Sequence, residues 1–403
     1  MKTALYTIFR CTNYGAVMQA YALARTLRGI MGEDSVDVLN HRMDPRDNHL
    51  LGKISNPNTP WFQRWRNRRK FAARYYRPEA FEMRRTKTIR LIDELVRPTT
   101  HLFKSPDELR GLQPYATVVV GSDQVWNPVL NHDFGRNQYL GGDLPREQDR
   151  VAYAASFGVS ELPTTSLDEY RRALSMFRAI TVREESGAKI CRELFCGSQG
   201  SIPFDAQHCG PSVVLDPTML LAADDWRAAF ASAGKDHGAT GNGTVQGRHV
   251  AAYWVRTVTE ADVAALARIS KAMSAPVCLM SAGPLPKYSF PPEVVPYVEA
   301  DPFDFARTVA ESIAVVTDSF HGLQFSALFK RPFLALGDLQ DPRSNASRLV
   351  DFCVRYGIAN GVQDIESFRE NVTPPFADPA AFDCSALETD RIRSLRTLKE
   401  LLP

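Results

Sequence analysis

The residues best placed for chemistry are Asp318, Ser319 and His321, a polar run that directly follows the apolar stretch 314–317. That stretch predicts a buried strand, and a helix is expected to begin near Gly322. In open α/β sheets ligands bind at the carboxyl ends of strands, and the free N–H groups of a following helix favour an anion. His321 is therefore a candidate proton-transfer group or anion contact. The alternative is a helix capped by Ser319 and Asp318 beside a buried, hydrogen-bonded histidine.

A second candidate, Arg183, follows the predicted strand 179–182. A guanidinium at a strand end could hold a phosphate or carboxylate through two parallel hydrogen bonds. The alternative role for Arg183 is a salt bridge to Glu184 or Glu185.

Polar residues also follow the predicted strands 4–9 and 116–120. Gly15 would let the backbone approach a ligand closely, although a tight turn between a strand and a helix explains this glycine equally well. The glycine stands alone, without a GxGxxG or Walker pattern, so the sequence does not indicate a dinucleotide or nucleoside triphosphate site. The site candidates in these two regions are Asn13, Tyr14, Gly15, Ser122, Asp123, Trp126 and Asn127.

The elements that must position these residues alternate between strands and helices through most of the chain. With 403 residues, of which 44% are hydrophobic, there is enough material for two cores. We therefore predict an α/β protein with two Rossmann-like, doubly wound domains. A Gly-rich stretch at 234–247 suggests the boundary between an N-terminal domain at 1–230 and a C-terminal domain at 248–380. Residues 381–403 are predicted to form a C-terminal helix.

The stretch 61–90 differs from the rest of the chain. It carries eleven Lys or Arg residues and two acidic ones, with aromatic residues between them, whereas the whole chain has a net charge of +2. Such a stretch is typical of a surface that attracts phosphate groups or an anionic membrane, and a solvated basic helix is the alternative. The near-neutral chain lacks a nucleic-acid motif, so we do not expect it to bind nucleic acid.

The sequence predicts neither a membrane span nor a signal peptide. No run of 18 apolar residues predicts a membrane span, and the N-terminal residues are typical of a first strand rather than a signal peptide. The seven cysteines include no CxxC pair, which is typical of free thiols in a reducing cytoplasm.

Six local patterns, in this order along the chain, resemble the polysaccharide pyruvyltransferases. They are TNYGAVMQAYAL from Thr12, VVVGSDQVWNP from Val118, ITVREES from Ile180, VVLDPTMLL from Val213, TDSFHG from Thr317 and NASRLVDF from Asn345. The resemblance implies a fold similar to the GT-B glycosyltransferases, with a site in the cleft between two domains. It also implies phosphoenolpyruvate as the donor and a saccharide with two neighbouring hydroxyls as the acceptor. The product would be a cyclic pyruvate ketal, with release of phosphate.

The resemblance also implies roles for individual residues. The histidine matching His321 is taken as the catalytic group in the family, and an arginine matching Arg183 looks like a donor-binding residue. Some members carry an arginine directly before the histidine, where this chain has Phe320. We expect Arg348 to supply the charge that is missing there.

The turn before the helix is expected to complete the donor site. Ser319 would hydrogen-bond the donor together with N–H groups from Gly322 onward, and Asp318 would orient the histidine or cap the helix. The chemistry requires no metal in principle, and we expect no metal or other cofactor.

The N-terminal candidates would bind the acceptor, because they offer the hydrogen bonds and aromatic surface that sugars need. The basic stretch 61–90 favours a phosphorylated or lipid-linked acceptor, handled at the cytoplasmic face of a membrane. Two other functions stay open. One is a sugar-nucleotide glycosyltransferase on the same architecture, and the other is a family member that acts on a non-polysaccharide acceptor or only binds.

Overall fold

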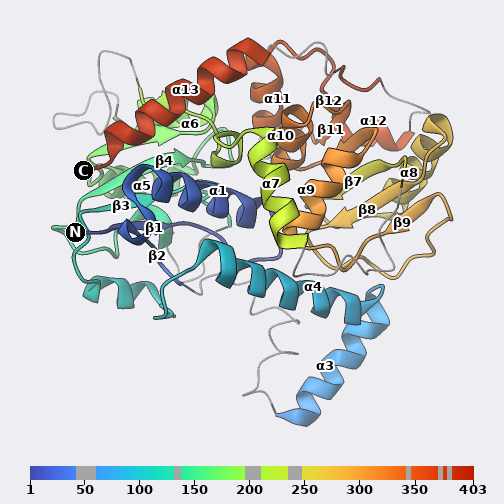
Figure 1. The fold of residues 1–403 in the computed structure, drawn as a ribbon, viewed down its shortest axis with the longest axis horizontal. Helices are drawn as coiled ribbons and strands as arrows, with labels where there is room; N and C mark the ends of the chain where they lie inside the picture. The colour runs from blue at the N-terminus through green and yellow to red at the C-terminus, as the bar shows by residue number, and fades with distance from the viewer. Residues whose placement is uncertain are drawn as a thin grey trace.

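The computed structural model describes residues 1–41, 60–130, 138–195, 210–234, 247–341, 346–370, 375–378 and 384–403. Within them, two six-stranded sheets stand side by side, each with parallel strands and flanking helices (Figure 1). The predicted α/β class with two Rossmann-like domains is confirmed. None of the described helices combines the length and the apolar character needed to cross a bilayer.

The first sheet has the strand order β2-β1-β3-β4-β5-β6. Its strands are β1 (Thr3–Tyr6), β2 (Val36–Val38), β3 (Thr117–Val120), β4 (Arg150–Ala155), β5 (Ala179–Val182) and β6 (Ser212–Val213). Strands β1, β3 and β4 are buried throughout because helices cover both faces, as in parallel sheets generally. The strand order reverses between the parallel strands β1 and β3, so the crevice at their carboxyl ends is the expected ligand position. The flanking helices are α1 (Tyr14–Met31), α5 (Leu167–Leu174) and α6 (Glu185–Phe195).

The second sheet has the order β12-β11-β10-β7-β8-β9, which is the Rossmann order with its reversal between β7 and β10. Its strands are β7 (Val250–Trp254), β8 (Val277–Ser281), β9 (Val294–Pro296), β10 (Ala314–Thr317), β11 (Phe333–Gly337) and β12 (Val362–Asp364). Its helices are α8 (Glu260–Met273), α9 (Pro302–Glu311), α10 (Phe320–Leu328), α11 (Ala346–Arg355) and α12 (Ile365–Glu370). Helix α7 (Ala223–Gly234) precedes this half.

A continuous hydrophobic core joins the two halves. Tyr14 of α1 stacks on Tyr253 of β7, with ring centroids 5.1 Å apart, and on Phe305 of α9 at 5.6 Å. Tyr21 of α1 meets Phe303 of α9 edge-on. Because α1 belongs to the first sheet and α9 to the second, these contacts fix how the carboxyl ends of the two sheets face each other.

The last helix, α13 (Cys384–Leu401), returns from the second half to the first (Figure 1). The Ser394 hydroxyl accepts a hydrogen bond from Leu215 N at 3.0 Å, and Arg391 donates to the Met219 carbonyl at 2.8 Å. Helix α13 therefore holds the segment that follows β6.

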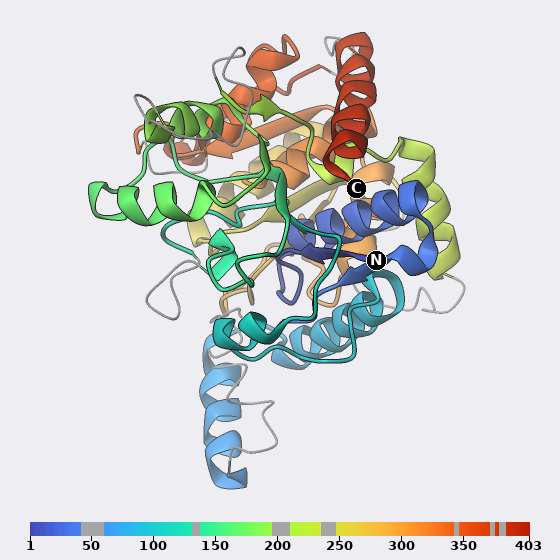
Figure 2. The same cartoon turned by 90° about the vertical axis from the view of Figure 1, so that its left-hand side faces the viewer.

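The basic stretch forms two helices, α3 (Trp61–Arg74) and α4 (Pro78–Leu91), followed by a short π-helical turn at Ile92–Val96. Helix α4 lies against the body, and α3 projects away from it (Figures 1 and 2). Arg84 of α4 is buried and donates to the Tyr14 hydroxyl and to the carbonyl of Ala282. Part of the basic stretch is therefore structural and binds the two halves together.

Candidate active site

The turn between β10 and α10 is a helix N-terminus with Ser319 as its cap. Helix α10 begins at Phe320, two residues before the predicted start, because the Ser319 hydroxyl accepts from Gly322 N at 3.2 Å. The capping alternative is therefore correct for Ser319. The same bond occupies the Gly322 N–H that we predicted would hold a donor. A Cβ atom on Gly322 would come within 2.4 Å of Thr317 Oγ1, so this position must lack a side chain.

Ser319 rather than Asp318 caps α10, so the capping prediction for Asp318 is corrected, and the printed partners of its carboxylate lie beside β7 rather than at His321. Its carboxylate accepts from Val255 N at 2.6 Å and Arg256 N at 3.2 Å, and it pairs with the Arg256 guanidinium at 3.0 Å. Burial raises the pKa of Asp318 to about 6, although Arg256 and the two N–H groups oppose the shift. Asp318 thus links the carboxyl end of β10 to the segment that follows β7.

His321 lies between the two halves of the molecule. It comes from α10, but its Nε2 is 3.4 Å from the Asp216 carboxylate of the first half. On the other side the ring touches the start of α1, where a Cβ on Gly15 would come within 2.1 Å of His321 Nδ1. The side chain is 5% exposed. Gly15 is therefore required by a close approach of the histidine itself.

Asp216 is the residue at which the site converges, and it was not among the predicted site residues. Its carboxylate accepts a hydrogen bond from the Arg183 guanidinium at 2.7 Å. It also accepts from Thr218 N at 2.9 Å and from Thr218 Oγ1 at 2.7 Å. Burial alone would raise the pKa of Asp216, but His321, Arg183 and Thr218 hold it well below its usual range. The sequence contained a signal for this residue, since Asp216 directly follows the apolar run 213–215.

Arg183 is surrounded by carboxylates. Besides Asp216 it contacts Asp123 at 3.3 Å and Glu184 at 3.5 Å, and its side chain is 1% exposed. Burial opposes the charge, but these three carboxylates keep the pKa of Arg183 above its ordinary value. The predicted salt bridge to Glu184 is present as one part of this larger cluster.

Phe320 lies between two guanidinium groups. The Arg183 guanidinium carbon is 4.7 Å from the centre of the Phe320 ring, and that of Arg348 is 5.6 Å from it. Such cation–π contacts stabilise a cation beside an aromatic face. Burial and the nearby Arg183 lower the pKa of Arg348 to about 10. Arg348 thus lies beside the position where some family members carry an arginine.

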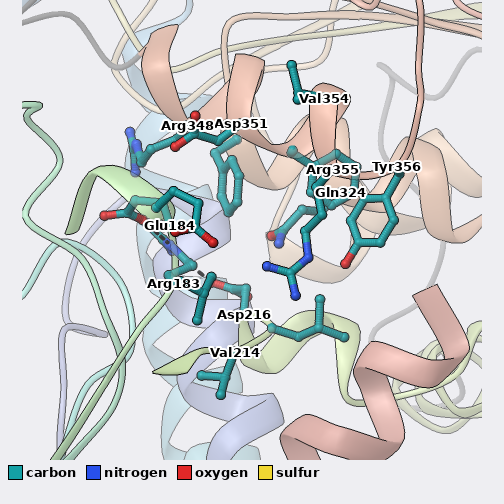
Figure 3. Close-up of a pocket in the computed structure, with 15 residues that line it drawn as sticks. Arg183, Glu184, Val214, Asp216, Gln324, Arg348, Asp351, Val354, Arg355 and Tyr356 are labelled. Carbon is teal, nitrogen blue, oxygen red and sulfur yellow. Dashed lines mark hydrogen bonds and ion pairs between the residues drawn. The ribbon is translucent and has the colours of Figure 1, made fainter. Parts of the chain in front are cut away.

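A cavity of about 240 Å³ opens beside this cluster (Figure 3). Both halves line it, with Arg183 and Asp216 from the first half and Gln324, Arg348 and Arg355 from the second. His321 is not part of its wall; it lies one layer behind Asp216 and Phe320. The cavity is therefore an anion-sized space next to the histidine rather than around it.

Two of the predicted acceptor residues contact Asp216 or Arg183, and two others contact the second half of the molecule. Ser122 and Asp123 join the cluster, since Ser122 Oγ is 3.5 Å from Asp216 and Asp123 pairs with Arg183. Asn13 caps α1 and receives the Tyr253 hydroxyl at 3.3 Å. Tyr14 is buried, with its hydroxyl bonded to Arg84 and to the Ala300 carbonyl.

Trp126 and Asn127 face the interior and do not line the cavity. Trp126 is fully buried among Phe157 and Phe177, and its indole N–H donates to the Tyr139 carbonyl. The Asn127 side chain accepts from the N–H groups of residues 129 and 130. Their placement does not support acceptor binding by these two side chains.

Among the described residues, no group of three or more His, Cys, Asp or Glu side chains could hold a metal ion. The groups that converge at the site are an imidazole, two guanidiniums and several carboxylates. They can move a proton and bind an anion.

The family model of the polysaccharide pyruvyl transferases matches residues 13–338, a span that contains His321, Arg183 and Asp216. The chain belongs to this family. The polysaccharide pyruvyl transferase described here is therefore a transferase. No match was found among curated proteins.

Matches were also found among solved structures. UDP-GlcNAc 2-epimerase from Neisseria meningitidis is 9% identical with a TM-score of 0.43, and the match covers 98% of this chain and 100% of the other. The same enzyme from Methanocaldococcus jannaschii is 11% identical with a TM-score of 0.42, over 98% and 99%. The Escherichia coli ADP-heptose heptosyltransferase II is 13% identical with a TM-score of 0.35, over 99% and 100%.

Proposed function

We propose that this polysaccharide pyruvyl transferase moves the pyruvyl group of phosphoenolpyruvate onto two neighbouring hydroxyls of a saccharide, forming a cyclic ketal and releasing phosphate. The observation that carries the proposal is the convergence on Asp216. This one carboxylate contacts Arg183 from its own half of the molecule and His321 from the other. The proposed proton-transfer group, His321, and the proposed anion-binding group, Arg183, therefore both contact the same carboxylate.

The reaction requires a proton at C3 of the enol and electrophilic character at C2. In the proposed sequence His321 gives its proton to C3, and the first saccharide hydroxyl attacks C2. The C2–O bond to phosphate breaks, and the second hydroxyl closes the ring on C2. Two hydroxyl protons are released: one restores His321, and the other leaves with phosphate or solvent. Histidine suits this role because it exchanges protons near neutral pH.

Arg183 and Arg348 would receive the anionic donor in the cavity. Arg183 is already neutralised by carboxylates, whereas the Arg348 Nε is buried without a hydrogen-bond partner in the described structure. A buried donor group without a partner costs free energy that an incoming acceptor can recover. Arg348 therefore supplies the charge that is absent at Phe320 and is the proposed contact for the phosphate or carboxylate of the donor.

The two halves must separate for catalysis, because His321 is closed off by Gly15 and Asp216. The contacts on either side of the imidazole come from the first half, so a small opening would expose it to the cavity. Closure over the bound donor would then exclude water, which is a common use of domain movement in transferases.

We place the reaction in the cytoplasm, where phosphoenolpyruvate is made, and in the synthesis of an exopolysaccharide or another cell-surface glycan. The proposal is tested by incubating the protein with phosphoenolpyruvate and a panel of saccharides in deuterated water. Phosphate release with a ketal whose methyl group carries one deuterium is expected. A ketal methyl without deuterium would refute proton donation to C3 from an exchangeable group.

The same panel discriminates the alternative functions. A sugar-nucleotide glycosyltransferase would be stabilised against heat by a nucleotide sugar and not by phosphoenolpyruvate. Turnover of phosphoenolpyruvate only with a non-saccharide hydroxyl compound would indicate a changed acceptor.

A further inference from the structure

Helix α3 stands away from the rest of the molecule (Figures 1 and 2). A 14-residue helix is about 21 Å long. It is attached near its C-terminal end, where Phe71 is its one buried residue and packs near Phe81 of α4. In the described part of the chain, the N-terminal turns of α3 therefore form an exposed tip.

The tip exposes large aromatic side chains. Trp61 is 74% exposed, Trp65 56% and Phe62 53%, whereas Trp126, Trp226 and Trp254 are fully buried. At 100° per residue, Trp61, Phe62 and Trp65 occupy one side of the helix, and Phe71 lies on a different side. Leaving two tryptophans in water is unfavourable, so this side is expected to contact something other than solvent.

The same helix is strongly basic. Residues 61–77 contain seven Lys or Arg and no acidic residue. Arg68 and Arg77 face Glu82 and Glu299 at 3.8 and 3.2 Å. No described acidic side chain pairs with the remaining five, Arg64, Arg66, Arg69, Lys70 and Arg74. The Arg69 guanidinium lies over the Trp65 ring at 4.8 Å, so the charges are beside the aromatic side.

We propose that α3 binds the surface of a bilayer rich in anionic lipids. Trp61, Phe62 and Trp65 would lie at the level of the lipid headgroups, where the amphipathic indole is favoured. Arg66, Arg69 and Lys70 would contact the headgroup phosphates. A second copy of this chain is a poorer partner, because two such tips would bring like charges together.

The adjoining helix connects this surface to the site. A second cavity, of about 220 Å³, lies between α4 and the segment that follows β1, and Arg85, Ile89 and Thr12 are among its lining residues. Thr12 is three residues before Gly15, which touches His321. A saccharide attached to a membrane lipid could therefore enter along α4 on the side where α3 holds the membrane. This assignment of a membrane-attached acceptor rests on the proposed function, whereas membrane binding by α3 does not.

Vesicle flotation tests the proposal directly. The full chain is mixed with phosphatidylcholine vesicles with or without 30% phosphatidylglycerol, at low and high salt. We expect binding only to the anionic vesicles, weakened by salt because the charges are screened. Lipids brominated near the headgroup should quench the emission of Trp61 and Trp65 and not that of the three buried tryptophans.

Two variants locate the contact on α3. The triple change Arg66→Gln, Arg69→Gln and Lys70→Gln should weaken binding about 100-fold, at roughly fivefold per charge. The change Trp61→Ala, Phe62→Ala and Trp65→Ala should abolish the quenching and leave the thermal unfolding temperature unchanged.

Matched controls alter the same kinds of residue elsewhere. The control for the charge variant combines Lys189→Gln, Arg227→Gln and Arg393→Gln. The control for the aromatic variant combines Met176→Ala, Leu339→Ala and Ile392→Ala. All six side chains are exposed, and both control variants should bind like the parent chain. Binding that ignores lipid charge, or α3 variants that bind like the controls, would overturn the proposal. So would binding to an RNA oligomer but not to vesicles, or loss of self-association as the only effect of the α3 variants. None of these readouts depends on catalysis, so failure of the ketal chemistry would leave them unaffected.

Discussion

Asp216 shows how a buried carboxylate can serve several partners at once. One oxygen faces Arg183 and His321, and the other accepts both Thr218 donors. Removing one partner from a buried, hydrogen-bonded charge is costly, because the other charge stays buried and uncompensated. Asp216 is therefore a positioning residue for both proposed reactive groups.

Replacing Asp216 with Asn keeps the size and removes the charge. We expect turnover to fall on the order of 100-fold, because Arg183 and His321 both lose the charged oxygen that holds them in place. Steady-state kinetics with phosphoenolpyruvate would measure the loss, and a circular dichroism spectrum like that of the parent chain would show that the fold is kept. Turnover close to that of the parent chain would contradict the positioning role.

Gly15 is expected to be intolerant of a side chain. Gly15→Ala would place a Cβ within 2.1 Å of His321 Nδ1, forcing the halves apart or displacing the imidazole. We expect a loss of about 1–3 kcal/mol in the free energy of unfolding, typical of overpacking, together with lost activity. Gly29→Ala is the matched control, since it lies in the same helix with no atom within 4 Å, and it should stabilise slightly. Similar urea unfolding curves for both variants would contradict the contact.

Asp351 makes donor binding dependent on pH. Burial and the neighbouring Glu184 raise the pKa of Asp351, which lines the cavity, to about 6. The carboxyl group is neutral below that pH and becomes an anion above it, where it repels the anionic donor. The ratio of the KM for phosphoenolpyruvate in the parent chain to that in Asp351→Asn should therefore rise as the pH passes through 6. A ratio that stays constant from pH 5 to 8 would exclude this effect.

At the level of elements, local sequence signals identified most of the strands and helices near the site. The stretches 179–182 and 314–317 form strands with the predicted bounds. The predicted start of α10 was wrong by two residues, because the capping alternative for Ser319 is the correct one and places Phe320 in the first turn. Asp318 was placed in the wrong role because its partners, Val255 and Arg256, lie more than 60 residues away and meet it only in the folded sheet.

Helix α13 controls the position of Asp216 from the far end of the chain. Ser394→Ala would leave the buried Leu215 N–H without its partner, next to Asp216. We expect a loss of about 1–3 kcal/mol in the free energy of unfolding, measured with urea. Thr389→Ala, at an exposed position of the same helix where the hydroxyl donates to the Ser385 carbonyl one turn earlier, should change stability far less. Equal effects of the two changes would show that α13 does not hold this segment.

For the whole molecule, the site exists only where the two sheets face each other. The sequence predicted that polar residues end several strands, and so identified His321, Arg183, Ser122 and Asp123 as candidates. It could not predict which strand ends meet, because that depends on how α1 packs against the second half. For the same reason it did not reveal Asp216 as the meeting point, or that Trp126 lies in the core.

The central claim is that His321 performs proton transfer to phosphoenolpyruvate. The most direct test compares the parent chain with His321→Ala, using phosphate release from phosphoenolpyruvate and the mass of the ketal formed on an accepted saccharide. We predict that the variant keeps its circular dichroism spectrum and loses turnover by at least about 100-fold. Ketal formation by purified His321→Ala at a near-normal rate would contradict the account.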